Sequence, residues 1–157
     1  MSLRVSLAAQ TLALMRGDTL AKTYAVSTSK HGAGETHGSF KTPRGRHVVR
    51  AKIGAGEPLN AVFQGRRPTG EIYSAALARA HPDRDWILTR ILWLSGTEIG
   101  RNRLGRVDTM RRYIYIHGTP DTEPLGVPRS IGCIRMGNVD IVDLFDRVPV
   151  GTRVSIG

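Results

Sequence analysis

The chain has 157 residues, of which 40% are hydrophobic and 23% charged, as is typical of one folded domain rather than a disordered chain. Its longest apolar runs, such as residues 91–94, span only a few residues and exclude a membrane-crossing helix. The net charge is +10, of which residues 1–70 carry +8 from 11 basic and 3 acidic residues, yet no nucleic-acid-binding motif accompanies this charge.

The first part of the chain predicts strands. Residues 3–7 and 10–14 alternate between apolar and polar side chains, so we read them as strands and see no signal peptide. A turn at Arg16-Gly17-Asp18 leads into a return strand over residues 22–27. Residues 29–46, rich in Gly, Ser and Thr, are expected to form a loop, and residues 47–53 a further strand.

The second half adds strands and two short helices. Residues 75–80 have the composition of a helix that ends before Pro82, and residues 86–94 that of a buried strand. Residues 111–117 are expected to form a strand with Tyr113, Tyr115 and His117 on one face.

The C-terminal segment predicts a helix and a last strand. Asn138 is expected to cap a helix that runs to Arg147, and residues 152–156 a strand. We therefore expect a mostly-β single domain over residues 1–157, with barrel-like or sandwiched mixed sheets and one or two short helices.

Cys133 is the only cysteine, so the chain has no intrachain disulfide and no cysteine-based metal cluster, and we expect neither metal nor cofactor. Gly132 before it allows a tight turn, in which the N–H groups of Gly132 and Cys133 face one oxygen as an oxyanion hole. His117 ends a predicted strand and is the natural base for a cysteine nucleophile. The residues alone favour a plainer interpretation, a strand-end histidine bonded to a loop carbonyl beside a buried cysteine.

Two blocks resemble the signature of L,D-transpeptidase (YkuD-type) catalytic domains. They are His117-Gly118-Thr119 and the segment Ser130-Ile131-Gly132-Cys133-Ile134-Arg135-Met136. Residues 26–28, 42–45, 93–94 and 113–117 also resemble elements of that family, so that the resemblance covers nearly the whole chain.

The resemblance implies a β-rich enzyme that transfers peptidoglycan stem peptides. The cysteine thiolate attacks the carbonyl at the L-centre of diaminopimelate in a stem tetrapeptide and releases D-Ala, and an amine then resolves the thioester. Its implied partners are peptidoglycan stems, and its implied location is the cell envelope, in the periplasm.

Carried onto this sequence, the resemblance makes Cys133 the nucleophile and His117 the base. Gly118 supplies a carbonyl that orients the imidazole, and the backbone of Gly132 and Cys133 supplies the oxyanion donors. The expected substrate contacts are Arg135, through its planar guanidinium, together with Ser130 and Tyr115.

One position departs from the family pattern. The family usually has a histidine between the serine and the glycine, where this chain has Ile131, and no other histidine lies nearby in sequence. His31 and His37 lie in the Gly-rich loop, which could fold over the site, but we expect both to be solvated. Two alternatives therefore stand beside the transpeptidase. One is an L,D-carboxypeptidase or endopeptidase that uses the same Cys–His pair, and the other is a wall-binding protein with an impaired site.

Overall fold

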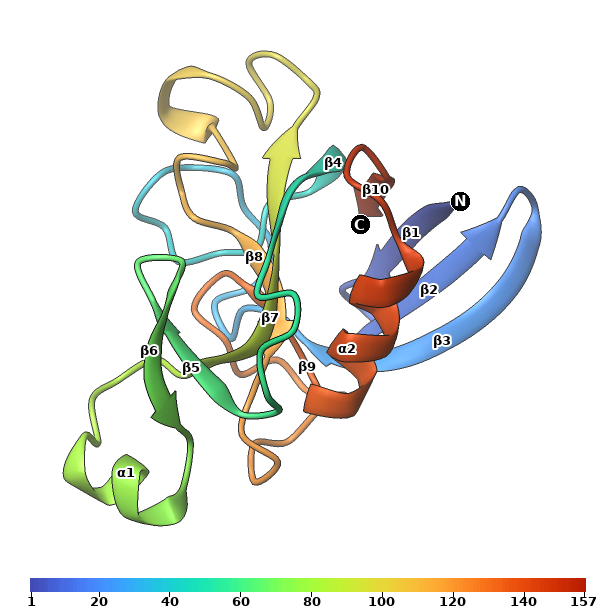
Figure 1. Ribbon diagram of the computed structural model, residues 1–157. Coiled ribbons are helices and arrows are strands. Elements are labelled where there is room, and N and C mark those ends of the chain that lie inside the picture. The colour runs from blue at the N-terminus through green and yellow to red at the C-terminus, as the bar shows by residue number, and fades with distance from the viewer.

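The computed structural model describes residues 1–157 and consists mainly of strands (Figure 1). The strands, in chain order, are β1 (Ser2–Ser6), β2 (Thr11–Arg16), β3 (Thr19–Ser27), β4 (Gly45–Ile53), β5 (Ala61–Gln64), β6 (Arg67–Ile72), β7 (Ile87–Gly96), β8 (Tyr115–Gly118), β9 (Ile134–Met136) and β10 (Arg153–Ile156). The helices are α1 (Ala75–Ala80), α2 (Asn138–Arg147) and a 3₁₀ turn at Gly105–Val107. No helix is both long and apolar enough to cross a membrane.

The sheet closes on itself. Its strand order is β4-β10-β1-β2-β3-β9-β8-β7-β5-β6, and a further pairing between β4 and β7 joins the ring. Most neighbours are antiparallel, whereas β1 runs parallel to β10 and β8 parallel to β9. The predicted mostly-β, barrel-like fold is therefore confirmed.

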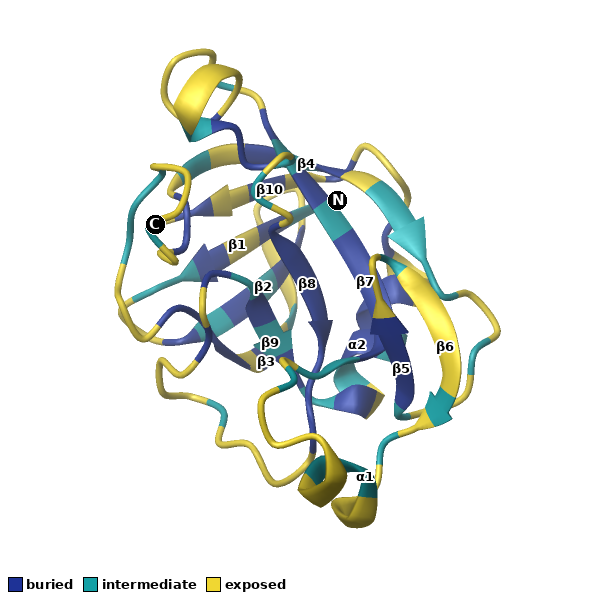
Figure 2. Ribbon diagram, turned by 90° about the vertical axis from the view of Figure 1, so that its left-hand side faces the viewer, coloured by how far each residue is buried: buried dark blue, intermediate teal, exposed yellow.

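The barrel interior holds the main core. Alternate residues such as Leu3 and Val5 point inward while Arg4 between them is exposed, and the same alternation runs through β10 (Figure 2). Helix α2 packs on β7 and β8 and contributes Ile141 and Leu144 to this core. A smaller cluster outside the ring contains Phe63 of β5, and it lies on the side of the sheet that faces the candidate site.

The β5–β6 hairpin is absent from the sequence prediction. Strand β6 contains Pro68 and Gly70, which have poor strand propensity and are tolerated because β6 is an edge strand paired only with β5. Figure 2 shows β6 mostly exposed and β5 buried against β7. This hairpin forms one wall of the pocket described below.

Two local predictions are wrong. The strand predicted over residues 111–117 begins only at Tyr115, because the chain makes a turn in which Tyr113 has a φ of 56°. Gly137, not Asn138, is the N-cap of α2. The Asn138 side chain is instead buried and donates to the Thr119 carbonyl, because a backbone group inside the protein requires a partner.

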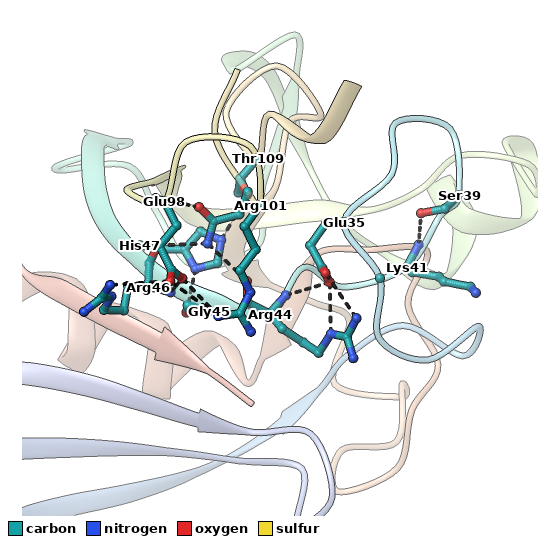
Figure 3. Close-up of polar contacts among 12 residues, drawn as sticks. Glu35, Ser39, Lys41, Arg44, Gly45, Arg46, His47, Glu98, Arg101 and Thr109 are labelled. Carbon is teal, nitrogen blue, oxygen red and sulfur yellow. Dashed lines mark hydrogen bonds and ion pairs between the residues drawn. The ribbon is translucent and has the colours of Figure 1, made fainter. Parts of the chain in front are cut away.

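The long loop after β7 is fixed to β4 through a buried histidine (Figure 3). The His47 Nδ1 atom donates to the carbonyl of Gly45 at 3.1 Å, and Nε2 lies 3.0 Å from the Thr109 hydroxyl. Burial lowers the pKa of His47 to about 4. Figure 3 also shows Arg46 and Arg101 converging on Glu98 at the surface.

Candidate active site

The register of β8 and β9 places the two predicted reactive side chains on one face. Ile116 pairs with Ile134, and both are fully buried in the barrel core. Because side chains alternate along a strand, His117 and Arg135 point away from that core. Cys133, one residue before Ile134, lies on the same side and packs against the smaller cluster outside the ring.

The His117 imidazole is fully buried and held by its own strand. Its Nδ1 atom lies 2.6 Å from the carbonyl oxygen of Gly118, so Nδ1 carries the hydrogen and Nε2 the free lone pair. Nε2 has no hydrogen-bond partner. Burial lowers the pKa of His117, while the nearby carboxylate of Asp85 acts in the opposite direction. A neutral imidazole with an unused lone pair is the form that accepts a proton.

Gly118 is required here because of close packing. A Cβ at this position would collide with the Asn138 Oδ1 atom and would lie 2.6 Å from the carbonyl oxygen of Leu88. The residue that supplies the orienting carbonyl must therefore be glycine, because any side chain at this position would displace the strand.

The turn before Cys133 depends on Gly132, whose φ of 131° is one that L-residues with side chains rarely adopt. Ser130 is buried, and its hydroxyl donates to the Cys133 carbonyl at 2.6 Å and accepts from the Gly132 N–H at 3.3 Å. Thr42 donates to the carbonyl of Gly132 at 2.9 Å. The Cys133 N–H makes no hydrogen bond within the protein, so of the two predicted oxyanion donors it is the one left free.

Cys133 borders a pocket of about 410 Å³. The pocket is lined by Phe40, Phe63, Gly65, Arg66, Asp85, Ile87, Ile91, Arg112, Tyr113, Ile114, Tyr115, Ile131 and Cys133. The Sγ atom accepts from the Tyr115 N–H and donates to the Tyr113 carbonyl, each at 3.3 Å, and makes no hydrogen bond to His117. Although the residue as a whole is half-buried, burial of the thiol raises the pKa of Cys133 to about 12.

Arg135 is already paired within the protein. Its guanidinium contacts Asp85 at 3.2 Å and Glu123 at 3.8 Å, and its side chain is only 14% exposed. The positive charge of Arg135 compensates the Asp85 carboxylate beside His117. In this structure, the predicted carboxylate-binding arginine therefore balances charge inside the site.

The other predicted contacts are placed differently. Tyr115 is buried, and its hydroxyl accepts from Arg66 at 3.0 Å at the pocket wall. The hydroxyl of Ser130 is used within the turn. Ile131 is 42% exposed on the pocket rim. It also lines a second, neighbouring cavity of about 250 Å³, which the exposed His37 borders as well.

Sequence reasoning missed Arg66, Asp85 and Arg112, which reach the pocket from three separate loops. No local pattern marks them, because each comes near Cys133 only through the closure of the sheet. The structure contains no group of three or more His, Cys, Asp or Glu side chains that could hold a metal ion.

A sequence model of the L,D-transpeptidase catalytic domain (YkuD) matches residues 2–156. The chain belongs to the L,D-transpeptidase family. A putative L,D-transpeptidase YkuD of Bacillus licheniformis is 30% identical over 153 residues, which cover 97% of this chain and 62% of the relative. A probable L,D-transpeptidase ErfK/SrfK of Salmonella typhimurium is 56% identical over 45 residues, or 29% of this chain and 15% of the relative.

Solved L,D-transpeptidase structures share the fold. L,D-transpeptidase 3 of Mycobacterium tuberculosis superposes with a TM-score of 0.61 at 15% identity, covering 99% of this chain and 60% of that one. The L,D-transpeptidase LdtMt1 in complex with imipenem gives a TM-score of 0.58 at 20% identity, covering 99% and 57%. This L,D-transpeptidase domain therefore spans less than two thirds of the length of these relatives.

Proposed function

We propose that this domain is a cysteine acyltransferase that acts on peptidoglycan stem tetrapeptides. The supporting observation is the shared outer face of β8 and β9, which carries the free lone pair of His117 and the pocket-lining thiol of Cys133. An unpaired, fully buried ring nitrogen is costly, and proton transfer from the thiol gives that nitrogen a function.

In the first step the Sγ atom of Cys133 bonds to the carbonyl carbon at the L-centre of diaminopimelate, and its proton passes to Nε2 of His117. Since burial favours the neutral forms of both groups, proton transfer accompanies attack rather than preceding it. In the free protein the thiol hydrogen points to the Tyr113 carbonyl, so substrate binding must turn the side chain toward His117.

The tetrahedral oxygen then accepts a hydrogen bond from the free N–H of Cys133. The carbon–nitrogen bond breaks, His117 returns the proton to the leaving D-Ala amine, and a thioester remains on Cys133. An amine of a second stem attacks this thioester and gives up a proton to Nε2 of His117. The carbon–sulfur bond then breaks, an amide forms, and the proton passes from His117 to Sγ, which restores the thiol. This substrate implies a location in the cell envelope, such as the periplasm.

The test is incubation with a carbapenem and, separately, with a disaccharide tetrapeptide, followed by mass spectrometry of the intact protein. We expect an acyl adduct that is lost in Cys133→Ala and forms about 10²–10⁴-fold more slowly in His117→Ala. Absence of any adduct from both reagents at neutral pH would contradict the catalytic proposal and favour a wall-binding protein.

Water in place of the second amine would make the same pair an L,D-carboxypeptidase. The products of the tetrapeptide reaction separate the two activities, because transfer yields a cross-linked dimer and hydrolysis a free tripeptide. We favour transfer because Cys133 lines a pocket whose walls are mostly apolar, and apolar walls disfavour water as the group that attacks the thioester.

A further inference from the structure

Arg66 occupies the tip of the β5–β6 hairpin and reaches the pocket that holds Cys133. Gln64 pairs with Arg67, so Gly65 and Arg66 form a two-residue turn with φ values of 53° and 62°. Positive φ at both central residues is the geometry of a type I′ turn, for which Asn and Gly are the favoured residues. An arginine at the second position is therefore unfavourable for the backbone.

The side chain of Arg66 is held in one orientation despite this cost. Its guanidinium carbon lies 4.9 Å from the ring centre of Trp93 and 4.6 Å from that of Tyr113. Its NH1 group donates to the hydroxyl of Tyr115 at 3.0 Å. Because the backbone N–H of the same Tyr115 contacts the sulfur of Cys133, a single tyrosine residue spans the gap between the guanidinium and the nucleophile.

Strained backbone is concentrated around this pocket. Of the seven non-glycine residues with positive φ, Phe40, Arg66 and Tyr113 line the pocket. Such conformations cluster where a binding site requires a side chain in a fixed place. We read the three together as the walls of a preformed subsite.

Neither arginine of this pocket, Arg66 or Arg112, makes an ion pair, but Arg66 keeps more of its N–H donors free. Arg112 donates to the carbonyls of Gly34 and Lys41 and to the hydroxyl of Ser39, so its donors are used to hold the loop over residues 34–41. Arg66 makes no ion pair, and Tyr115 is its one hydrogen-bond acceptor. A guanidinium fixed on its aromatic side, with free N–H groups, suits bidentate binding of a carboxylate.

We propose that Arg66 is a substrate-binding residue that recognises a carboxylate on the donor stem. Its separation from Cys133 by one tyrosine assigns it to the carboxylate at the far end of the diaminopimelate side chain, rather than to groups next to the attacked carbonyl. This inference rests on the proposed acyl transfer at Cys133.

The experiment compares two donor tetrapeptides that differ only at this position, one with the free carboxylate and one with its amide. The rate of D-Ala release is measured as kcat and KM for each donor in the wild type, Arg66→Asn and Arg67→Gln. Asparagine favours the left-handed turn, so Arg66→Asn removes the guanidinium while preserving the hairpin. Arg67 is exposed and outside the pocket, which makes Arg67→Gln a control for the loss of one positive charge.

We expect the wild type to favour the free carboxylate by about ten- to hundredfold in kcat/KM, mainly through KM. Arg66→Asn should reduce this preference to about twofold or less, and Arg67→Gln should retain it. Equal rates with both donors in the wild type would overturn the proposed recognition of this carboxylate, and an undiminished preference in Arg66→Asn would overturn its assignment to Arg66. Failure of both donors to react with Cys133 would overturn the proposed acyl transfer and this inference with it.

Discussion

The Nδ1 atom of His117 lies 2.6 Å from the carbonyl oxygen of Gly118, the next residue in the chain. This contact fixes the imidazole tautomer from the backbone of β8 itself, without a carboxylate as the orienting group. The position of the base therefore depends on the path of one short strand, which packs against Leu88 and Asn138.

Gly118→Ala tests that dependence. The added methyl would collide with Asn138 and the Leu88 carbonyl, so the strand must shift and carry the orienting carbonyl away from Nδ1. We expect a loss of about 1–3 kcal/mol in the free energy of unfolding and at least about tenfold slower acylation of Cys133. Urea unfolding and mass-spectrometric acylation rates measure the two effects.

Gly137→Ala is the matched control, because the nearest atoms to a Cβ there are 3.8 Å away. It should change acylation little. Similar losses in both variants would show that the effect of Gly118→Ala is general destabilisation and not displacement of the carbonyl.

Arg135→Gln should shift the pH dependence of acylation. Removing the guanidinium leaves the Asp85 carboxylate uncompensated beside His117, and this raises the pKa of His117. Because acylation needs the neutral imidazole, the acid limb of the pH–rate profile should move to higher pH. The measurement is the rate of carbapenem acylation against pH.

The double variant Arg135→Gln with Asp85→Asn removes both charges and should return the acid limb toward its wild-type position. If the profile of the single variant is unchanged, the ion pair does not set the protonation of His117.

His47 predicts a loss of stability in mild acid. Its folded-state pKa of about 4 lies below the ordinary value of 6.5, so between these pH values the unfolded chain binds a proton that the folded protein excludes. Stability should therefore be constant above about pH 6.5 and fall by up to about 3 kcal/mol as the pH approaches 4. Urea unfolding at a series of pH values measures this loss.

His47→Gln should be less stable near neutral pH, because it disturbs the contacts to Gly45 and Thr109, and its stability should fall less steeply in acid. The remaining slope reflects His117, whose pKa burial also lowers. An equally steep decline in the variant would assign the acid sensitivity to other groups.

Ile131→His restores the residue that is usual in the family. The position is 42% exposed on the pocket rim, and the Nε2 lone pair of His117 already supplies a proton acceptor at the site. We expect acylation to stay within about threefold of the wild-type rate. An increase of tenfold or more, measured with the same carbapenem assay, would show that the second imidazole takes part in the reaction.

Local pattern was sufficient for much of the fold. The alternation in residues 3–7, the turn at Arg16-Gly17-Asp18 with its return strand over residues 22–27, and the apolar spacing in α2 each predict an element that the structure contains. The β5–β6 hairpin is not predicted from the sequence, because Pro68 and Gly70 weaken the strand pattern of β6. The hairpin joins the sheet through the pairing of β5 with β7. Strand β8 begins later than its apolar pattern predicts, because the turn at Tyr113 contains no glycine or proline that would mark it in the sequence.

The sequence by itself determined that Cys133 follows a glycine turn, that His117 and Gly118 lie near the end of a strand, and that both blocks have an L,D-transpeptidase-like pattern. Only the tertiary structure decided that parallel pairing of β8 and β9 brings them to one face, and that Arg135 is paired while Arg66 is free. The physical reason is that pairing, burial and ion-pair formation depend on segments distant in the chain. The pattern of neighbouring residues indicates the local conformation of a residue. It does not indicate which charged and aromatic side chains surround that residue once the barrel closes.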